Sequence, residues 1–149
     1  MSMKIVRAER KHLDQVAPLF DQYRQFYKQP PDGAAARTYI EERLQKGDAV
    51  IFLAEANGKA LGFVQLYPSL ASISMKPIWI LYDLFVAPDA RTTGVGRALM
   101  ERSRQHGEET NAGQIILETA TDNANAQRLY EKLGYKRDEE FFRYALALN

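Results

Sequence analysis

Two glycines, Gly94 and Gly96, stand at the start of a helical pattern and shortly after an apolar strand pattern. Glycine has no Cβ, so the backbone can curl tightly there and come close to a ligand. The first N–H groups of a helix have no partner within the helix, and they attract anions, phosphates above all. We therefore expect a phosphate-binding turn between a central strand, residues 79–86, and a helix that runs from the glycines to about Gln105.

Other glycine-rich phosphate loops do not fit this stretch. The sequence has no G-x-x-x-x-G-K-[ST] loop and no G-x-S-x-G hydrolase turn, and the dinucleotide-binding pattern would need a third glycine where Leu99 stands. What remains is Arg91-x-x-Gly94-x-Gly96, and glycines at this spacing also occur in ordinary turns. The spacing alone leaves a phosphate site and a plain turn open.

The elements that must position this turn follow from hydrophobic periodicity. Strand patterns cover residues 4–8, 49–56, 59–67, 79–86, 114–119, 135–138 and 141–148. Helical patterns cover residues 12–28, 34–46, the stretch from the glycines to about Gln105, and 126–133. Residues 69–77 are expected to form a loop, and Asn57-Gly58 predicts a tight hairpin. We expect one α/β domain over residues 1–149, with a mostly antiparallel mixed sheet of six to seven strands and about four helices.

Composition and charge exclude several classes of function. The chain has 149 residues, a formal net charge of +1 and no cysteine. This balance offers no basic face for nucleic acid or a membrane surface, and the lack of cysteine excludes disulfides, cysteine–zinc sites and a cysteine nucleophile. The N-terminal residues lack an apolar signal core, and no apolar run is long enough to span a bilayer. We expect a soluble cytoplasmic protein without a metal, and we expect His12 and His106 at its surface.

Two blocks resemble the motifs of the GNAT superfamily of N-acyltransferases. Residues 86–99, VAPDARTTGVGRAL, are similar to its acyl-CoA-binding motif, in which Arg or Gln is followed by x-x-Gly-x-Gly or Ala. Residues 123–135, NANAQRLYEKLGY, are similar to its pattern N-x-x-A-x-x-L-Y-x-x-x-G-[FY]. The blocks occur in the right order with one strand between them, and the element order is similar along essentially the whole chain. Thr92 is a departure, because many members carry glycine there.

The resemblance implies the GNAT fold, with the sheet splayed at the acyl-CoA site, and acetyl-CoA as the co-substrate. Backbone N–H groups from about Thr92 to Arg97 would hold the pyrophosphate, and the strand backbone just before the turn would pair with the pantetheine arm. Tyr130 matches the tyrosine that protonates the departing thiolate, although helix packing would also explain it. The acyl-CoA contacts implied are Leu84, Phe85, Val86, Arg91, Thr92, Thr93, Gly94, Val95, Gly96, Arg97, Asn123, Asn125 and Tyr130.

Some of these residues have a plainer interpretation as well. We expect either Arg91 or Arg97 to be a solvated surface charge. Asn123 and Asn125 stand where either could cap the following helix, and this role is compatible with a contact to the CoA arm.

The general base is left open between Asp83, Glu118 and ordered water, and Asp83 could instead be a buried carboxylate held by backbone donors. In members that resemble polyamine and thialysine acetyltransferases this strand carries a carboxylate pair, whose Asp aligns with Asp83 and whose Glu is replaced by Tyr82. Strand alternation should separate Asp83 from Tyr82 and Leu84. The predicted acceptor-binding residues are Tyr27, Tyr82 and Asp83.

The predicted activity is direct transfer of an acetyl group from acetyl-CoA to a primary amine. A small free amine, such as an amino acid, a thialysine-like compound or a polyamine, is favoured over protein lysine or N-terminal amines. The alternative from another class is a non-catalytic acyl-CoA-binding regulatory module. An RNA-directed acetylating toxin would need a basic face, which the charge balance does not offer. The apolar segment 141–148 invites pairing, so we expect a homodimer.

Overall fold

The computed structural model describes residues 2–149 and contains two compact units, the first ending at Glu118 and the second comprising Thr119–Asn149. The first unit contains a five-stranded sheet in the order β1-β2-β3-β4-β5. Its strands are β1 (Lys4–Arg7), β2 (Val50–Ala56), β3 (Lys59–Ala71), β4 (Lys76–Val86) and β5 (Ile115–Leu117). Neighbours from β1 to β4 pair antiparallel, and β5 runs parallel to β4. The predicted mixed α/β sheet is thus confirmed, whereas a single domain over residues 1–149 stays a prediction.

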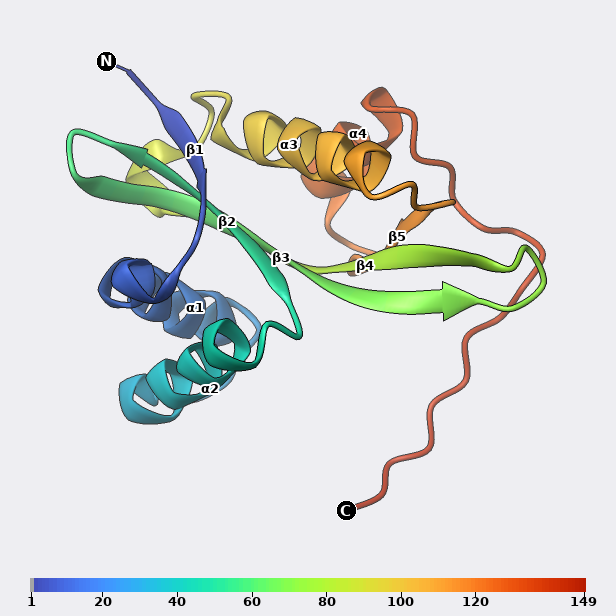
Figure 1. Cartoon of the computed structure of the whole chain (residues 1–149), viewed down its shortest axis with the longest axis horizontal. Coiled ribbons are helices and arrows are strands. Elements are labelled where there is room, and N and C mark those ends of the chain that lie inside the picture. The colour runs from blue at the N-terminus through green and yellow to red at the C-terminus, as the bar shows by residue number, and fades with distance from the viewer. Residues whose placement is uncertain (1) are drawn as a thin grey trace. The chain divides into compact units, whose positions relative to one another are not determined.

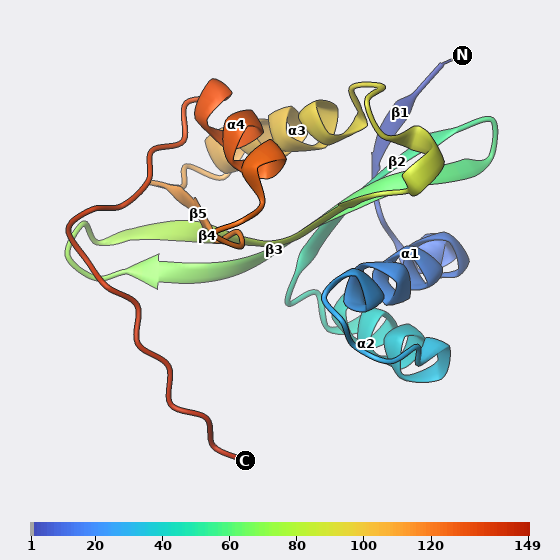
Figure 2. The ribbon, with the colours of Figure 1, turned by 180° about the vertical axis from the view of Figure 1, so that it is seen from behind.

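Helices cover both faces of the sheet in the first unit. The helices α1 (Leu13–Phe26) and α2 (Gly33–Lys46) lie on one face, and α3 (Val95–Glu109) lies on the other (Figure 1, Figure 2). The fourth helix, α4 (Ala124–Lys132), belongs to the second unit. In the part of the chain that the structure describes, no helix is long and apolar enough to cross a membrane.

The central strands are apolar on both faces because both faces are covered. Phe52 on β2 and Phe63 on β3 are fully buried, and Val16 of α1 and Leu99 of α3 are buried with them. The predicted hairpin at Asn57-Gly58 joins β2 to β3, and both of its residues have a positive φ. This fits the tight two-residue turn that an Asn-Gly pair favours.

Two predicted strands, residues 135–138 and 141–148, are wrong, because the described chain has no strand there. A strand exists only by pairing with a neighbour, and the segment 135–149 pairs with none of the five strands. The prediction of a loop over residues 69–77 is wrong in most of its length. Ser69–Ala71 continue to pair with Lys76–Ile78, so the hairpin between β3 and β4 is longer than its composition indicates.

His106 is not at the surface as predicted but is 5% exposed. Its ring centre lies 4.7 Å from that of Trp79 and 5.6 Å from that of Phe52. Burial lowers the pKa of His106, helped by the nearby charges of Arg7 and Arg102. A neutral imidazole therefore packs here as part of the core beneath α3.

Candidate functional site

The turn between β4 and α3 has the backbone of an anion-binding turn. Pro88–Ala90 form a short 3-10 helix, and Gly94 then caps α3 with a φ of +87°, a conformation that favours glycine. No side chain bonds to the cap, and the first turn of α3 carries no acidic residue. The N–H groups at the start of α3 therefore have no carboxylate competing for them, which suits a phosphate group.

Thr92 stands in this turn in the left-handed region, with a φ of +65°. For a β-branched residue this conformation costs about 1–2 kcal/mol, so the rest of the turn must hold it. The Thr92 hydroxyl donates to the carbonyl oxygen of Arg91 at 2.5 Å, and the Thr93 hydroxyl donates to the carbonyl oxygen of Ala90. These local bonds fix the turn while leaving the backbone at the start of α3 to face outward.

The two arginines of the motif have different surroundings. Arg91 Nε donates to the carbonyl oxygen of Val86 at 3.2 Å, and its guanidinium carbon lies 5.6 Å from the centre of the Phe85 ring. Arg97 instead forms an exposed ion pair with Glu101 at 3.0 Å, one turn along α3. Arg91 is thus tied to the end of β4, and Arg97 has the surroundings expected of a surface charge.

One edge of β4 is open beside this turn. β5 pairs with β4 only at Trp79, Ile80 and Leu81, so from Tyr82 onward the described chain offers no strand neighbour on that side. Main-chain groups on such an edge can pair with an extended ligand as a strand would. On the other side, Gly62 of β3 lies so close to β4 that an added Cβ would come within 2.7 Å of the Phe85 carbonyl oxygen.

A bulge at Tyr82 decides which way Asp83 points. Gln65 pairs with Asp83 but Leu66 pairs with Leu81, so Tyr82 is an extra residue in β4. A bulge reverses the alternation of side chains. Asp83 therefore shares a sheet face with Phe85, which contacts α1, although Trp79 contacts α3 on the opposite face. The expected separation of Tyr82 from Asp83 is wrong, because Tyr82 contacts Tyr67 beside the same face.

Asp83 is a buried carboxylate with few partners. It is 4% exposed and accepts a hydrogen bond from Gln65 Nε2 at 2.7 Å, while Gln65 Oε1 is itself buried without a partner in the described chain. Burial raises the pKa of Asp83, and hydrogen bonding by Gln65 and Tyr23 opposes that rise. A carboxyl group whose pKa is raised in this way is a better proton acceptor near neutrality than an ordinary one.

Five tyrosines surround this carboxylate, and we call Tyr23, Tyr27, Tyr39, Tyr67 and Tyr82 the tyrosine cluster. The Tyr23 hydroxyl donates to the Tyr82 carbonyl oxygen at 3.2 Å, and the rings of Tyr67 and Tyr82 lie 5.8 Å apart. Burial, and next the charge of Asp83, raise the pKa of both Tyr23 and Tyr27, so both phenols stay neutral. Since Tyr27 and Tyr82 are 45% and 59% exposed, the cluster presents rings to solvent above one anion.

The other predicted site residues lie elsewhere. Glu118 is exposed and follows β5 directly. In the second unit, Asn123 caps α4 by accepting the Ala126 N–H at 3.2 Å, whereas the side chain of Asn125 accepts from Arg128. The ring of Tyr130 on α4 lies 6.0 Å from that of Tyr135. The structure thus brings Tyr27, Tyr82 and Asp83 together, and it assigns the helix cap to Asn123.

Sequence reasoning missed Gln65 as part of this site. Its signal is a single polar residue within the apolar run Phe63–Leu66, where every side chain is buried. A buried amide needs a polar partner, and a carboxylate on the neighbouring strand is one. The pairing itself was out of reach because it depends on the bulge at Tyr82.

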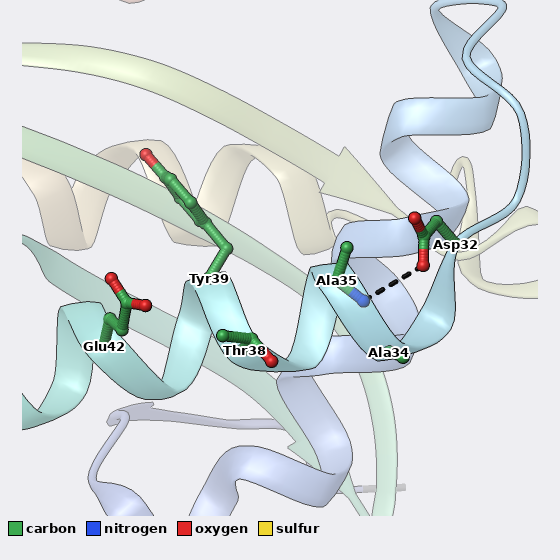
Figure 3. A pocket seen from close by; sticks show the side chains of 6 residues that line it. All are labelled: Asp32, Ala34, Ala35, Thr38, Tyr39 and Glu42. Atoms are coloured by element: carbon green, nitrogen blue, oxygen red, sulfur yellow. Dashed lines mark hydrogen bonds between the residues drawn. The ribbon is translucent and has the colours of Figure 1, made fainter.

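A shallow hollow on α2 is a weaker candidate. It is lined by Asp32, Ala34, Ala35, Thr38, Tyr39 and Glu42 (Figure 3). Asp32 is already used there as the cap of α2, since it accepts the Ala35 N–H at 3.1 Å. The hollow contains no predicted site residue and no buried carboxylate, so we assign no chemistry to it.

Comparisons with known proteins agree on one family. The sequence profile of the acetyltransferase (GNAT) family matches residues 14–135. The uncharacterized N-acetyltransferase YhfO of Bacillus subtilis is 42% identical over 97% of each chain. The D-amino-acid N-acetyltransferase HPA3 of Saccharomyces cerevisiae is 30% identical over 84% of this chain and 80% of its own length. A crystal structure of a probable acetyltransferase, 41% identical, matches with a TM-score of 0.92 over 98% of both chains.

Proposed function

Because the chain belongs to the GNAT acetyltransferase family and is an acyl-CoA-dependent N-acetyltransferase, we propose that it transfers the acetyl group of acetyl-CoA to the primary amine of a small molecule. The observation that carries the acceptor class is the buried Asp83 carboxylate beneath the partly exposed tyrosine cluster. An ammonium group is attracted both by the carboxylate and by the faces of aromatic rings. A cationic amine is therefore the acceptor that this surface suits.

The donor is held mainly by main-chain groups in this proposal. N–H groups from Thr92 to Arg97 bind the pyrophosphate, and the open edge of β4 at Leu84–Val86 pairs with the pantetheine arm. Each hydrogen bond to a charged acceptor contributes about 1.5–3 kcal/mol, and the helix dipole of α3 adds only about 0.3–1 kcal/mol. The array of N–H groups thus outweighs the dipole, which explains why the turn needs a glycine at Gly94 more than it needs a cation.

Asp83 takes the role of general base in the transfer. An alkyl ammonium with a pKa near 10.4 must lose a proton at neutral pH, which costs about 4–5 kcal/mol. Asp83 accepts that proton, the amine nitrogen forms a bond to the thioester carbonyl carbon, and the carbon–sulfur bond breaks. Backbone N–H groups of β4 polarise the carbonyl, and Tyr130 gives its proton to the departing thiolate. We favour Asp83 over Glu118 because burial raises the pKa of Asp83, whereas Glu118 is exposed.

A small molecule is preferred as the acceptor over a protein. The D-amino-acid N-acetyltransferase HPA3, 30% identical to this chain, carries a small amine in its name. Tyr82 replaces the second carboxylate that polyamine-type members carry, so a single buried anion, Asp83, matches a single ammonium group better than a long polycation. We therefore place amino acids and short monoamines ahead of polyamines.

A panel of amines tests this proposal. Thiol release from acetyl-CoA is measured with D- and L-amino acids, short monoamines, a diamine, an aminoglycoside and a lysine-containing peptide, and each product is confirmed by mass. We expect the highest kcat/KM with a small cationic amine. Preference for the peptide would overturn the small-molecule assignment, and CoA binding without thiol release from any amine would favour the regulatory module.

A further inference from the structure

The C-terminal arm, which we define as residues 135–149, is extended and carries neither helix nor strand. Its large apolar side chains are almost fully exposed, namely Phe141, Phe142, Tyr144, Leu146 and Leu148, at 76–90%. Single exposed hydrophobic residues need no explanation, but a contiguous run of this kind marks an interaction surface. The arm is thus a segment that needs a partner.

The sequence of the arm indicates what kind of partner it needs. Phe142, Tyr144, Leu146 and Leu148 alternate with Arg143, Ala145 and Ala147. A period of two places the four large side chains on one face of an extended chain. Such a segment buries its apolar face by joining the edge of a sheet, not by packing as a helix.

The sheet of the first unit offers two edges, and they differ in chemistry. β1 ends the sheet on one side and carries charges at both ends, Lys4 and Arg7, which is how proteins protect an edge. β5 ends it on the other side with Ile115, Ile116 and Leu117, none of them charged, and Ile116 is 40% exposed. An uncharged apolar edge strand is a template for another strand, so β5 is the edge that fits the arm.

We propose that the C-terminal arm of one copy adds as a strand to β5 of a second copy, and that the exchange is reciprocal. The arm and the edge that fits it are carried by the same chain, and within the described chain they do not pair with each other. A two-fold dimer satisfies both arms and both edges at once and leaves no end open. The solved acetyltransferase that is 41% identical aligns over 98% of this chain, a length that cannot leave the arm out. The arm is therefore a dimerisation element.

Cross-linking distinguishes exchange from an arm that folds back onto its own sheet. The chain has no cysteine, so Ile116→Cys and Leu146→Cys each introduce a single thiol. The two single variants carry tags of different length, are mixed, and are treated with a short bis-maleimide whose reach spans neighbouring register positions. We expect a mixed product with the summed mass of both chains. If the double variant cross-links only within one chain and the mixture gives no mixed product, the proposal is overturned.

Substitution on the two faces of the arm provides a matched pair. Leu146→Glu places a charge on the large apolar face, and Ala147→Glu places the same charge on the other face. By light scattering over a concentration series, we expect wild type and Ala147→Glu to be dimers and the dimer dissociation constant of Leu146→Glu to rise at least tenfold. Circular dichroism checks that both variants fold. A monomeric wild type, or a Leu146→Glu variant as tightly dimeric as wild type, contradicts the exchange.

Discussion

At the scale of single residues, Asp83 carries the proposed acceptor chemistry. A carboxylate that is 4% exposed loses hydration that one Gln65 hydrogen bond does not replace. Such a group is retained when its proton affinity or its charge is used, and raised pKa values concentrate at functional sites for this reason. The neutral phenols around it leave Asp83 as the anion that an incoming ammonium meets.

Asp83→Asn keeps the shape of the side chain and removes its charge. We expect kcat/KM for the best amine to fall about 10²–10⁴-fold, the usual contribution of a general base. The dissociation constant of CoA should stay within about twofold, since main-chain groups bind it in this account. Asp48→Asn, which changes an exposed carboxylate bonded to Arg43, is the matched control. Unchanged turnover in Asp83→Asn would remove Asp83 from the chemistry.

The raised pKa of Asp83 also makes a prediction about stability and pH. Folding raises this pKa, so the folded chain holds the proton more tightly than the unfolded chain does. The contribution of Asp83 to stability is therefore most favourable at low pH, and it is lost as pH rises from the ordinary carboxyl pKa through the raised value. Urea unfolding should show Asp83→Asn gaining stability relative to wild type across that window. A difference that stays flat or falls with pH would contradict the raised pKa.

Tyr130 is predicted to act through its hydroxyl alone. Tyr130→Phe keeps the ring that lies 6.0 Å from Tyr135, so the fold and CoA affinity should be retained. We expect kcat to fall about 10²-fold or more, because the thiolate then leaves without a proton donor. Tyr135→Phe, the neighbouring ring, serves as the control. Wild-type rates in Tyr130→Phe would show that this tyrosine only packs.

At the scale of elements, the bulge in β4 is the feature that periodicity could not predict. A pattern of alternating side chains assumes a regular ladder, and one extra residue at Tyr82 reverses it for everything that follows. Hydrophobic spacing predicted all four helices and the strands of the sheet, because each has an apolar face against the core. It failed at residues 141–148, where the apolar alternation is present but no strand of the described chain pairs with it.

Gly62 connects β3 to the proposed donor site. An added Cβ would lie 2.7 Å from the Phe85 carbonyl oxygen and 3.2 Å from Val95 Cγ1, so β4 and the start of α3 must move apart. We expect Gly62→Ala to destabilise the fold by about 1–3 kcal/mol and to weaken CoA binding. Chemical unfolding and calorimetric titration measure the two effects.

Gly33→Ala is the control for this change. A Cβ at Gly33 meets nothing within 4 Å, and the residue opens α2, so alanine there should be neutral or stabilising. Equal effects of the two substitutions would show that the close approach at Gly62 does not matter.

At the scale of the whole molecule, the sequence predicted the family and the donor motif better than the acceptor site. The glycine turn and its helix are local, so their residues are contiguous in the chain. The acceptor surface brings together residues from α1, α2, β3 and β4, and Gln65 and Tyr67 could be placed there only after the strand register was known. Site residues that are distant in sequence depend on pairing, which a single sequence does not specify.

The central claim is that CoA binds along the open edge of β4 and at the turn before α3. Backbone amide NMR during titration with CoA tests it most directly, since it reports each N–H separately. We predict the largest shifts at residues 84–86 and 92–97, with little change in β1 or in the α2 hollow of Figure 3. Shifts concentrated in the hollow around Tyr39 and Glu42, with residues 92–97 unchanged, would contradict the account.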